Sequence, residues 1–359
     1  MLKTDVYING AACVSPVKTN DDIDIPDEAT VVNNNTYLKC IEPLYKKYID
    51  PMTARRMSRV VKIGLYSAKS CLEDSGVELP DAIVTGTGLG CIEDTEKFID
   101  NIFRNDEKLL NPTPFIQSTH NTIGSQIALL LKCHNYNITY SQRGLTFESA
   151  LVDSLLLLKE KAFENVLLGG VDEITNYSFQ IMKRLGHWKR ENVNRMNLLE
   201  SQTKGSIAGE GAAFFLISDK TDKNTYAKIV SVKTINKPQD IENIKHIIHE
   251  FLADCNIGIS DIDLALFGFS GDKDFDTVYH ELVNTSFHNN ACGYFKHLCG
   301  EYHTASSFAM WLAATIIKKQ HVPEMVKIKS APVAKQFKNI LIYNHYRNIQ
   351  HSFLLLQHV

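Results

Sequence analysis

Apolar and polar positions alternate along the chain with two different periods. From Met52 to Ser75 apolar residues follow helical spacing, which predicts one long amphipathic helix. The run DAIVTGTGLG over Asp81–Gly90 predicts a buried strand that ends in a glycine-rich turn. Further helices are expected over Glu93–Asn105 and Thr122–Leu131, and residues 109–120, with their prolines, are expected to form a loop.

The stretch NITYSQRGLTFESALVDSLLLLKEKAFENVLLGGVDE, residues 137–173, shows both periods in succession. It predicts a strand, a tight turn at Gly144, a long helix and a second buried strand. A junction of strand, turn and helix is a frequent place for a catalytic nucleophile. The hydroxyl residue at this turn is Ser141, so the sequence raises the question of whether Ser141 reacts.

Two segments of the second part echo the first. FLADCNIGISDIDLALFGFSG (251–271) resembles CLEDSGVELPDAIVTGTGLG (71–90), and Asp254 falls where Asp74 does. The glycine and helix of residues 299–319 similarly resemble the Gly144 turn and its helix. The order of these echoes favours an internal duplication in a layered α/β fold, against chance similarity between two βα units.

Composition narrows the class of protein. The 359 residues carry a formal charge of −3, which gives no basic surplus for nucleic acid or an anionic membrane. No apolar run approaches the roughly 20 residues of a membrane helix, and the start predicts a short strand, not a signal peptide. Eight scattered cysteines without CxxC pairs are typical of free thiols, so we expect a cytoplasmic protein.

The familiar cofactor motifs do not fit. TGTGLGC (85–91) places its third glycine one residue too early for a dinucleotide fingerprint, and no phosphate-binding loop exists. No H-x-x-x-H pair supports a metal site. His120 in STHNT and His303 in GEYHT are candidate bases, although both are also compatible with structural roles. Glu301, two residues before His303, is either a proton-transfer partner or a helix cap.

Taken in order, a set of motifs resembles the β-ketoacyl-[acyl-carrier-protein] synthases. They are ARRMSRVVKIGLYSAKSCLEDSG, IVTGTGLGCIEDTEKF, NPTPFIQSTHNTIGSQIAL, TYSQRGLTFESAL, VLLGGVDE, GEGAAFFLIS and FKHLCGEYHTA. The resemblance implies a thiolase-like fold: duplicated βαβαβαββ halves in a five-layer α/β/α/β/α sandwich, usually dimeric. It divides the chain into halves over 1–226 and 227–359. It also implies no bound cofactor beyond the acyl-phosphopantetheine of a carrier protein as substrate.

The family's catalytic groups are replaced at the matching positions. Ser141 stands where the family has its acyl-accepting cysteine, and Glu301 stands where it has its second histidine. Phe267 or a neighbour fills the place of the first histidine. The family's lysine is retained as Lys296, and YNHYRN (343–348) replaces a glycine-rich loop.

A serine hydroxyl in this place needs a general base, because a helix dipole worth ~0.3–1 kcal/mol cannot ionise it. The candidate bases are His120, Glu301, His303 and His345. For Arg143, beside Ser141, three roles are open: filling an acyl tunnel, pairing with Glu301, or binding a carboxylate. Of these we favour the ion pair.

Three functions are therefore compared, and whether the chain is an enzyme is left open. The first is a chain-length-factor-like partner of an active ketosynthase, without acyl transfer of its own. The second is an acyltransferase or 3-oxoacyl synthase variant that uses Ser141 as acyl acceptor. The third is a binding protein on the same scaffold. The sequences of these motifs resemble those of ketosynthases from aryl-polyene and flexirubin-type pigment clusters.

The expected partners follow from the resemblance. They are an acyl carrier protein and a second subunit, in a homodimer or in a heterodimer with an active ketosynthase. Carrier proteins are acidic, so ARRMSR (54–59) is a candidate docking patch, although a solvated helix face explains it equally well.

Overall fold

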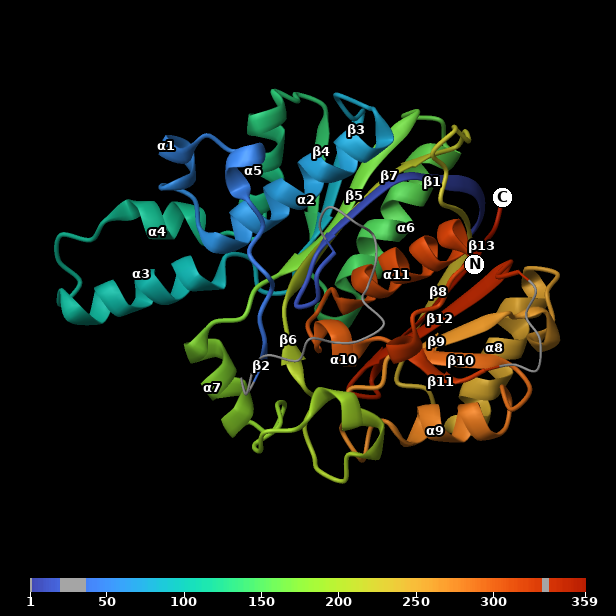
Figure 1. Cartoon of the computed structure of the whole chain (residues 1–359). Coiled ribbons are helices and arrows are strands. Elements are labelled where there is room, and N and C mark those ends of the chain that lie inside the picture. Colours follow the sequence, from blue (N-terminus) through green and yellow to red (C-terminus); the bar gives the residue numbers. More distant parts are fainter. Residues whose placement is uncertain (1, 20–36, 331–335) are drawn as a thin grey trace.

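The computed structural model describes residues 2–19, 37–330 and 336–359. Within these residues the strands form one large mixed sheet in the order β11-β10-β9-β12-β13-β8-β1-β7-β5-β3-β4 (Figure 1). Their bounds are β1 Leu2–Val14, β3 Ala82–Gly86, β4 Tyr136–Tyr140, β5 Asn165–Asp172, β7 Gly211–Ser218, β8 Ala227–Asn236, β9 Leu264–Phe267, β10 Ala291–Tyr294, β11 Lys327–Lys329, β12 Asn339–Tyr346 and β13 Gln350–Gln357. A separate short parallel pair joins β2 (Tyr37–Leu38) to β6 (Ala208–Gly209).

Helices connect most of the strands. They are α1 Pro51–Ala54, α2 Arg59–Ser75, α3 Ile92–Arg104, α4 Pro112–Gln117, α5 Thr122–Leu131, α6 Thr146–Lys159, α7 Asn176–Arg184, α8 Ile241–Asp254, α9 Thr277–Asn284, α10 Lys296–Cys299 and α11 Ala305–Lys319. Single 3₁₀ turns are η1 Tyr45–Lys47, η2 Arg143–Leu145, η3 Arg195–Glu200, η4 Ile259–Asp261 and η5 Glu324–Val326.

Two local expectations are wrong. The predicted single helix from Met52 is broken at residues 55–58, because Ser58 has extended backbone angles and α2 begins only after it. The predicted loop over 109–120 contains α4. Pro112 occupies the first helical turn, where its missing N–H costs nothing, and the Asn111 side chain accepts a hydrogen bond from the Thr113 N–H.

The strand arrangement repeats within the chain. In the first set, β3 is parallel to β4 and β5, and β7 is antiparallel to β5 and β1. In the second set, β9 is parallel to β10 and β12, and β13 is antiparallel to β12 and β8. Each set with its main helices reads βαβαβαββ, as the resemblance implies. The two sets meet where β1 pairs with β8 in antiparallel fashion, and β8 begins at Ala227, where the proposed second half starts.

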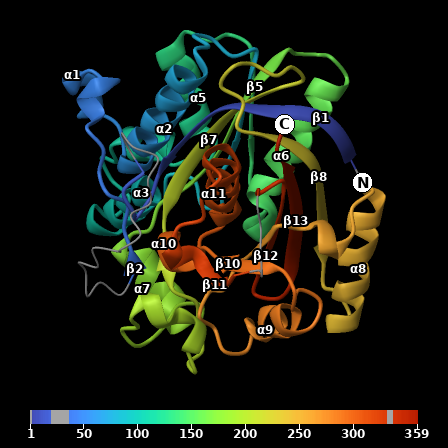
Figure 2. The same ribbon diagram turned by 45° about the vertical axis from the view of Figure 1, so that its right-hand side comes forward.

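The helices and strands form five layers. One large hydrophobic core surrounds the middle helices, and one further core lies under each outer helix layer. α2 and α5 cover one outer face, α8 and α9 cover the other, and α6 and α11 lie between the two sets of strands (Figure 2). Strand β7 has the sequence GAAFFLIS, which is almost entirely apolar because both of its faces are buried. Phe215 and Ile217 enter the central core, whereas Phe214 and Leu216 enter an outer core. The predicted thiolase-like five-layer fold is confirmed.

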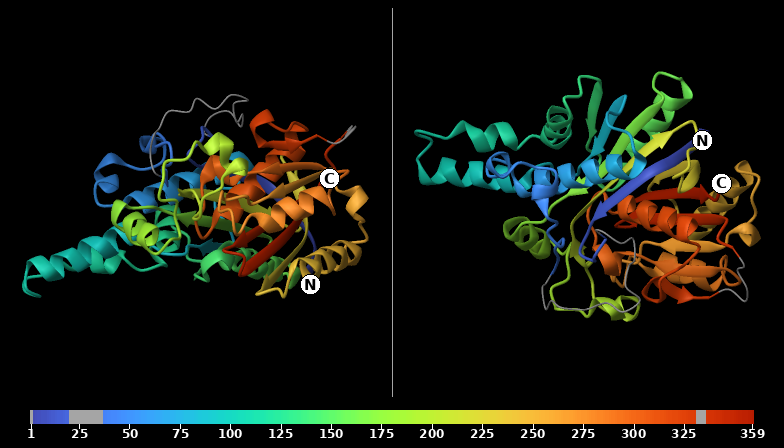
Figure 3. Two further views of the ribbon diagram at one scale, coloured as in Figure 1. Left: turned by 90° about the horizontal axis from the view of Figure 1, so that it is seen from below. Right: turned by 45° about the horizontal axis from the view of Figure 1, so that its top comes forward.

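One part of the chain projects from this body. The hairpin of α3 and α4 extends away from the layers in both views of Figure 3. Its exposed apolar side chains include Phe103, which is 80% exposed, and Leu109, which is fully exposed. Because folded chains seldom leave such residues in water together, the hairpin is a candidate contact surface.

Candidate functional site

The predicted elbow is present between β4 and α6. Ser141 and Arg143 are exposed, Gly144 is buried, and Arg143 has a left-handed backbone with φ of 52°. The Ser141 hydroxyl donates a hydrogen bond to the Gly88 carbonyl at 3.2 Å. Among the residues that the structure describes, no histidine or carboxylate is hydrogen-bonded to this hydroxyl. Its proton is therefore held by a backbone carbonyl and not by a base.

His303 is the candidate base that the fold brings nearest to the elbow's own contacts. A Cβ atom added to Gly88 would lie 2.3 Å from the His303 side chain, so Ser141 and His303 both contact Gly88. The Nδ1 atom of His303 is buried without a hydrogen-bond partner. His120 is exposed and packs its backbone beside Gly90. Both histidines thus lie near the glycine turn beside the elbow, but neither is hydrogen-bonded to Ser141 in the part of the chain that the structure describes.

Glu301 and Lys296 form a buried ion pair. The Lys296 Nζ lies 2.6 Å from Glu301 Oε2, and both side chains are almost fully excluded from solvent. Burial raises the pKa of Glu301, while the charge of Lys296 opposes that shift. Among the described residues Arg143 forms no salt bridge, so the favoured Arg143–Glu301 pair is wrong. Lys296 is the nearer cation because it lies on α10, immediately before the loop that carries Glu301.

His345, another candidate base, is held inside the protein. Its Nδ1 accepts from the Asn348 N–H at 3.2 Å, so Nε2 carries the proton and donates to the Phe275 carbonyl at 3.0 Å. Burial lowers the pKa of His345 well below its ordinary value. Both ring nitrogens are occupied, which indicates a structural role.

Two further positions differ from the family: that of its first histidine and that of its glycine-rich loop. Phe267 packs into the outer core beside α8 and α9, whereas its neighbour Gly268 lies against Lys296 and Asn344 and offers no side chain. A Cβ added to Gly144 would lie 2.1 Å from Tyr346 Cβ. Tyr346, on the segment that replaces the glycine-rich loop, is therefore packed directly on the elbow.

Buried carboxylates fix the loops around this region. Asp172 accepts from the Gly88 N–H at 2.7 Å and from both the backbone N–H and hydroxyl of Thr304, at 3.0 and 2.8 Å. Asp172 therefore joins the turn after β3 to the start of α11. Glu210 accepts from the Cys40 and Ile174 N–H groups and from Nη1 and Nη2 of Arg59. It likewise holds separate loops together.

Two residues that the sequence did not single out complete the neighbourhood. The Arg347 Nη1 donates to His187 Nε2 at 2.7 Å, across 160 positions of the chain. Tyr346, beside Arg347, has its ring 5.2 Å from that of His303. A small cavity of about 30 Å³ lies here, and it is lined by Leu89, Asp172, Glu173, Ile174, Ser178, Met182, Trp188, Gly209, Glu301, Tyr302, His303 and Tyr346. It has room for about one water molecule and for no acyl chain.

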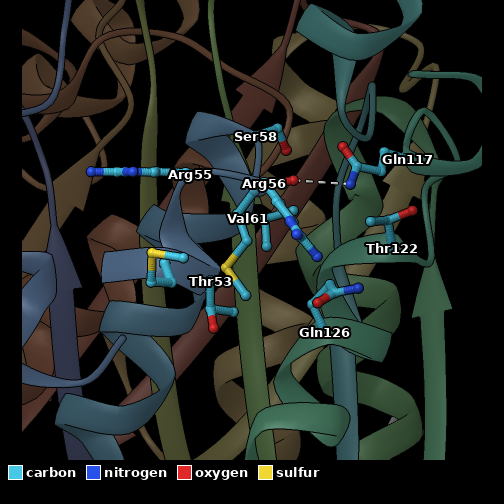
Figure 4. Close-up of a pocket in the computed structure, with 10 residues that line it drawn as sticks. Thr53, Arg55, Arg56, Ser58, Val61, Gln117, Thr122 and Gln126 are labelled. Carbon is cyan, nitrogen blue, oxygen red and sulfur yellow. Dashed lines mark hydrogen bonds between the residues drawn. The ribbon is translucent and has the colours of Figure 1, made fainter. Parts of the chain in front are cut away.

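A larger pocket of about 540 Å³ opens on another face, between the α1–α2 turn and α4–α5. It is lined by Met52, Thr53, Arg55, Arg56, Met57, Ser58, Val61, Gln117, Thr122 and Gln126. The Gln117 side chain donates to the Arg56 carbonyl at 3.0 Å, and Figure 4 shows the Arg56 side chain directed toward Gln126. Arg55 and Arg56 are both exposed. The ARRMSR segment is thus a turn at a pocket rim, not a continuous helix face.

In residues 2–19, 37–330 and 336–359, no group of three or more His, Cys, Asp or Glu side chains is arranged to hold a metal ion. Across the same described ranges, every helix is too short or too polar to cross a membrane.

Comparison with known proteins identifies the family. The family model of the beta-ketoacyl synthase N-terminal domain matches residues 33–245. A search of curated protein sequences gave no significant match. Among solved structures, the ishigamide ketosynthase/chain length factor matches with a TM-score of 0.80 and 14% identity, over 100% of both chains.

Two further structures give the same picture. A beta-ketoacyl synthase from Burkholderia phymatum STM815 matches with a TM-score of 0.79 and 13% identity, over 100% of both chains. The ketosynthase ApeO in complex with its chain length factor ApeC, from Xenorhabdus doucetiae, matches with a TM-score of 0.75 and 14% identity, over 99% of this chain and 98% of that one. At these identities the structures show a shared fold, and the family match covers more than half of the sequence. The chain therefore belongs to the β-ketoacyl synthase family.

Proposed function

We propose that this chain is a chain-length-factor-like subunit that pairs with an active β-ketoacyl synthase and transfers no acyl group itself. The observation that carries the proposal is the Ser141 hydroxyl, which donates to the Gly88 carbonyl. A serine needs a base that accepts its proton as it attacks. The helix dipole supplies ~0.3–1 kcal/mol, whereas each pKa unit requires ~1.4 kcal/mol.

Two further features support a non-catalytic role. Glu301 stands at the position of the second histidine and is neutralised by Lys296 at 2.6 Å. Tyr346 occupies the space over Gly144, where the family has a flexible glycine-rich loop. Together they remove the groups that would stabilise an enolate and an oxyanion. We place the protein in aryl-polyene or flexirubin-type biosynthesis, in the cytoplasm, from the wording of its motifs and its free cysteines.

The partner surface proposed here is the β4 edge with the α3–α4 hairpin. Among the described strands β4 ends the sheet and pairs only with β3, so we propose that the other side of its backbone receives a second chain. Exposed apolar side chains lie on the hairpin, on α5 and on β4 itself: Ile99, Phe103, Leu109, Phe115, Ile116, Leu129 and Tyr136. An active ketosynthase with the same fold would offer a matching edge. The alternative is a homodimer through the same surface.

For the acyl carrier protein, we propose docking at the pocket of Figure 4. Its rim carries the exposed Arg55 and Arg56, which suit the acidic surface of a carrier protein. Replacing both with glutamate should weaken carrier binding to the assembled complex at least tenfold, while the complex itself stays intact.

Co-expression with the ketosynthase of the same organism tests the main proposal. We expect a stable heterodimer that extends acyl chains, with activity unchanged when this chain carries Ser141→Ala. Intact-mass measurement of this chain after incubation with acyl-carrier protein should show no adduct. A chain that never associates with the ketosynthase, or an acyl adduct lost in Ser141→Ala, would refute the proposal; the adduct would favour the acyltransferase alternative.

A further inference from the structure

Basic side chains gather around Tyr346 at the mouth of the elbow. Tyr346 packs on Gly144, and the Gly144 N–H donates to Gln350 Oε1 at 3.0 Å, which ties the elbow to the β12–β13 turn. Arg143 lies on the elbow and Arg347 on the turn. His187 is hydrogen-bonded to Arg347, and the His303 ring lies 5.2 Å from that of Tyr346. We call Arg143, His187, His303 and Arg347 the basic cluster.

Hydrogen-bond donors in the basic cluster are left unused. A guanidinium has only donors, so His187 Nε2 must accept from Arg347, and the proton of a neutral His187 then resides on Nδ1. That Nδ1 atom is buried without a partner, and so is Arg347 Nε. A buried donor without an acceptor destabilises the fold, and a bound acceptor would remove that cost.

The positive charge of the basic cluster also has no carboxylate partner among the described residues. Arg143 forms no salt bridge there, and the Arg347 side chain has a hydrogen bond to the neutral ring of His187 and lies 5.9 Å from the centre of the Phe275 ring. Nearby carboxylates are engaged by other groups: Glu301 by Lys296, and Asp172 by Gly88 and Thr304.

The electrostatics of His187 agree with this geometry. Burial lowers the pKa of His187, and the charges of Arg347, His303 and Arg143 lower it further. His187 therefore lies within electrostatic range of the other three basic groups. An arrangement of this kind is stabilised by an anion that sits among them.

We propose that the basic cluster is a binding site for an oxyanion, either a carboxylate or a phosphate group. Guanidinium groups bind both through paired N–H donors, and Arg347 Nε and His187 Nδ1 have no acceptor among the described residues. The exposed Arg143 would close over the ligand from the elbow side. The inference concerns the isolated chain and holds whether or not the chain pairs with a ketosynthase.

Calorimetric titration of the purified chain tests the site, with sodium malonate and inorganic phosphate as probes against sodium chloride at equal ionic strength. We expect saturable binding of at least one probe. Stronger binding of malonate would assign a carboxylate ligand, and stronger binding of phosphate would assign a phosphate group.

Variants locate the binding. Arg143→Gln, on the exposed elbow, and Arg347→Gln should each weaken it at least tenfold. Arg104→Gln is the matched control, because Arg104 is 72% exposed, pairs with Asp100 and ends the projecting helix α3. Circular dichroism checks that each variant is folded, and Arg143→Gln keeps the test valid if Arg347→Gln does not fold.

Three results would overturn the proposal. They are no saturable binding of either probe, equal weakening in Arg104→Gln, and unchanged binding in Arg143→Gln. If the arginine variants instead weakened only the association with a ketosynthase, the basic cluster would belong to a protein interface and the oxyanion site would be refuted.

Discussion

The elbow before α6 and the loop before α11 occupy equivalent places in the two halves, yet they are built differently. Ser141 to Arg143 are exposed. The loop at Gly300–Thr304 is mostly buried, and its backbone is fastened on both sides. The Glu301 N–H donates to the Ile207 carbonyl at 2.7 Å, and the Gly209 N–H donates to the Glu301 carbonyl at 3.1 Å. The two halves thus carry equivalent loops before a helix. The loop before α6 is accessible to solvent, whereas the loop before α11, called the anchored loop below, is buried and fixed by backbone hydrogen bonds.

The largest effect on stability should come from breaking the buried ion pair between Lys296 and Glu301. Lys296→Met leaves Glu301 buried without its cation, and we expect a loss of roughly 3–5 kcal/mol in the free energy of unfolding, measured by chemical denaturation. The double variant Lys296→Met/Glu301→Gln should recover part of this loss, because it removes the charge. A loss below about 1 kcal/mol in the single variant would show that the pair does not hold the loop.

Gly300→Ala should cost about 3 kcal/mol. Gly300 has φ of 78° and ψ of 179°, a region that glycine alone adopts, and a Cβ there would lie 2.4 Å from Gly209 Cα. Gly186→Ala is the matched control: its φ is also 78°, but no atom lies within 4 Å of the added Cβ, so about 1 kcal/mol is expected. Equal losses in the two variants would mean that close packing of the loop contributes nothing.

Stability should depend on pH with opposite signs at two buried residues, one in each half. In the first, burial raises the pKa of Glu173 to about 8, so the folded state holds a proton that the unfolded state releases above about pH 4.5. Stability contributed by Glu173 is complete below that pH and declines until about pH 8. In the second, burial lowers the pKa of His351 to about 4, so its contribution is lost as pH falls from about 6.5 to 4.

Thermal or chemical unfolding between about pH 7.5 and 8 reports mainly on the buried acids, because the histidines are then largely neutral in both states. Glu173→Gln should flatten the decline by up to about 1 kcal/mol per pH unit. Below pH 6.5, His351→Gln should reduce the acid-side loss. A decline of unchanged slope in Glu173→Gln would assign the effect to another buried acid, such as Asp276, whose pKa burial raises to about 7.

The smallest effect is expected at the elbow itself. Ser141→Ala removes one hydrogen bond from an exposed side chain, so the unfolding free energy should change by less than about 0.5 kcal/mol. Beside Gly300→Ala, this result would separate the accessible loop from the anchored one. A loss above about 1.5 kcal/mol would show that Ser141 fixes the loop at Gly88 more firmly than its single bond indicates.

Local patterns predicted most of the fold, and long-range contacts account for what they missed. The apolar spacing over Thr122–Leu131 and after Gly144 is a local property of the sequence. The helices α5 and α6 were therefore predicted well. The break at Ser58 and the helix after Asn111 depend on single capping positions, which periodicity averages out.

The candidate site was predicted less completely. Ser141, Lys296 and Glu301 lie in recognisable motifs, and the structure brings the last two together. The contact of Arg347 with His187 joins positions 160 residues apart. Neither residue belongs to a motif with a recognised spacing, and hydrophobic periodicity does not predict a contact between residues so far apart in the sequence. The true partner of Glu301 likewise depended on side-chain geometry, which sequence spacing does not give.

The antiparallel pairing of β1 with β8 has a consequence for how the chain is made. β1 precedes α2, which packs on it, but its two neighbours in the sheet, β7 and β8, begin only at Gly211 and Ala227. The sheet partners of β1 are therefore some two hundred residues away along the chain, a separation that slows folding. A cut between residues 226 and 227 would leave β1 and β8 as long unpaired edges, which favour aggregation. The two halves, though duplicated in plan, are expected to fold only as one cooperative unit.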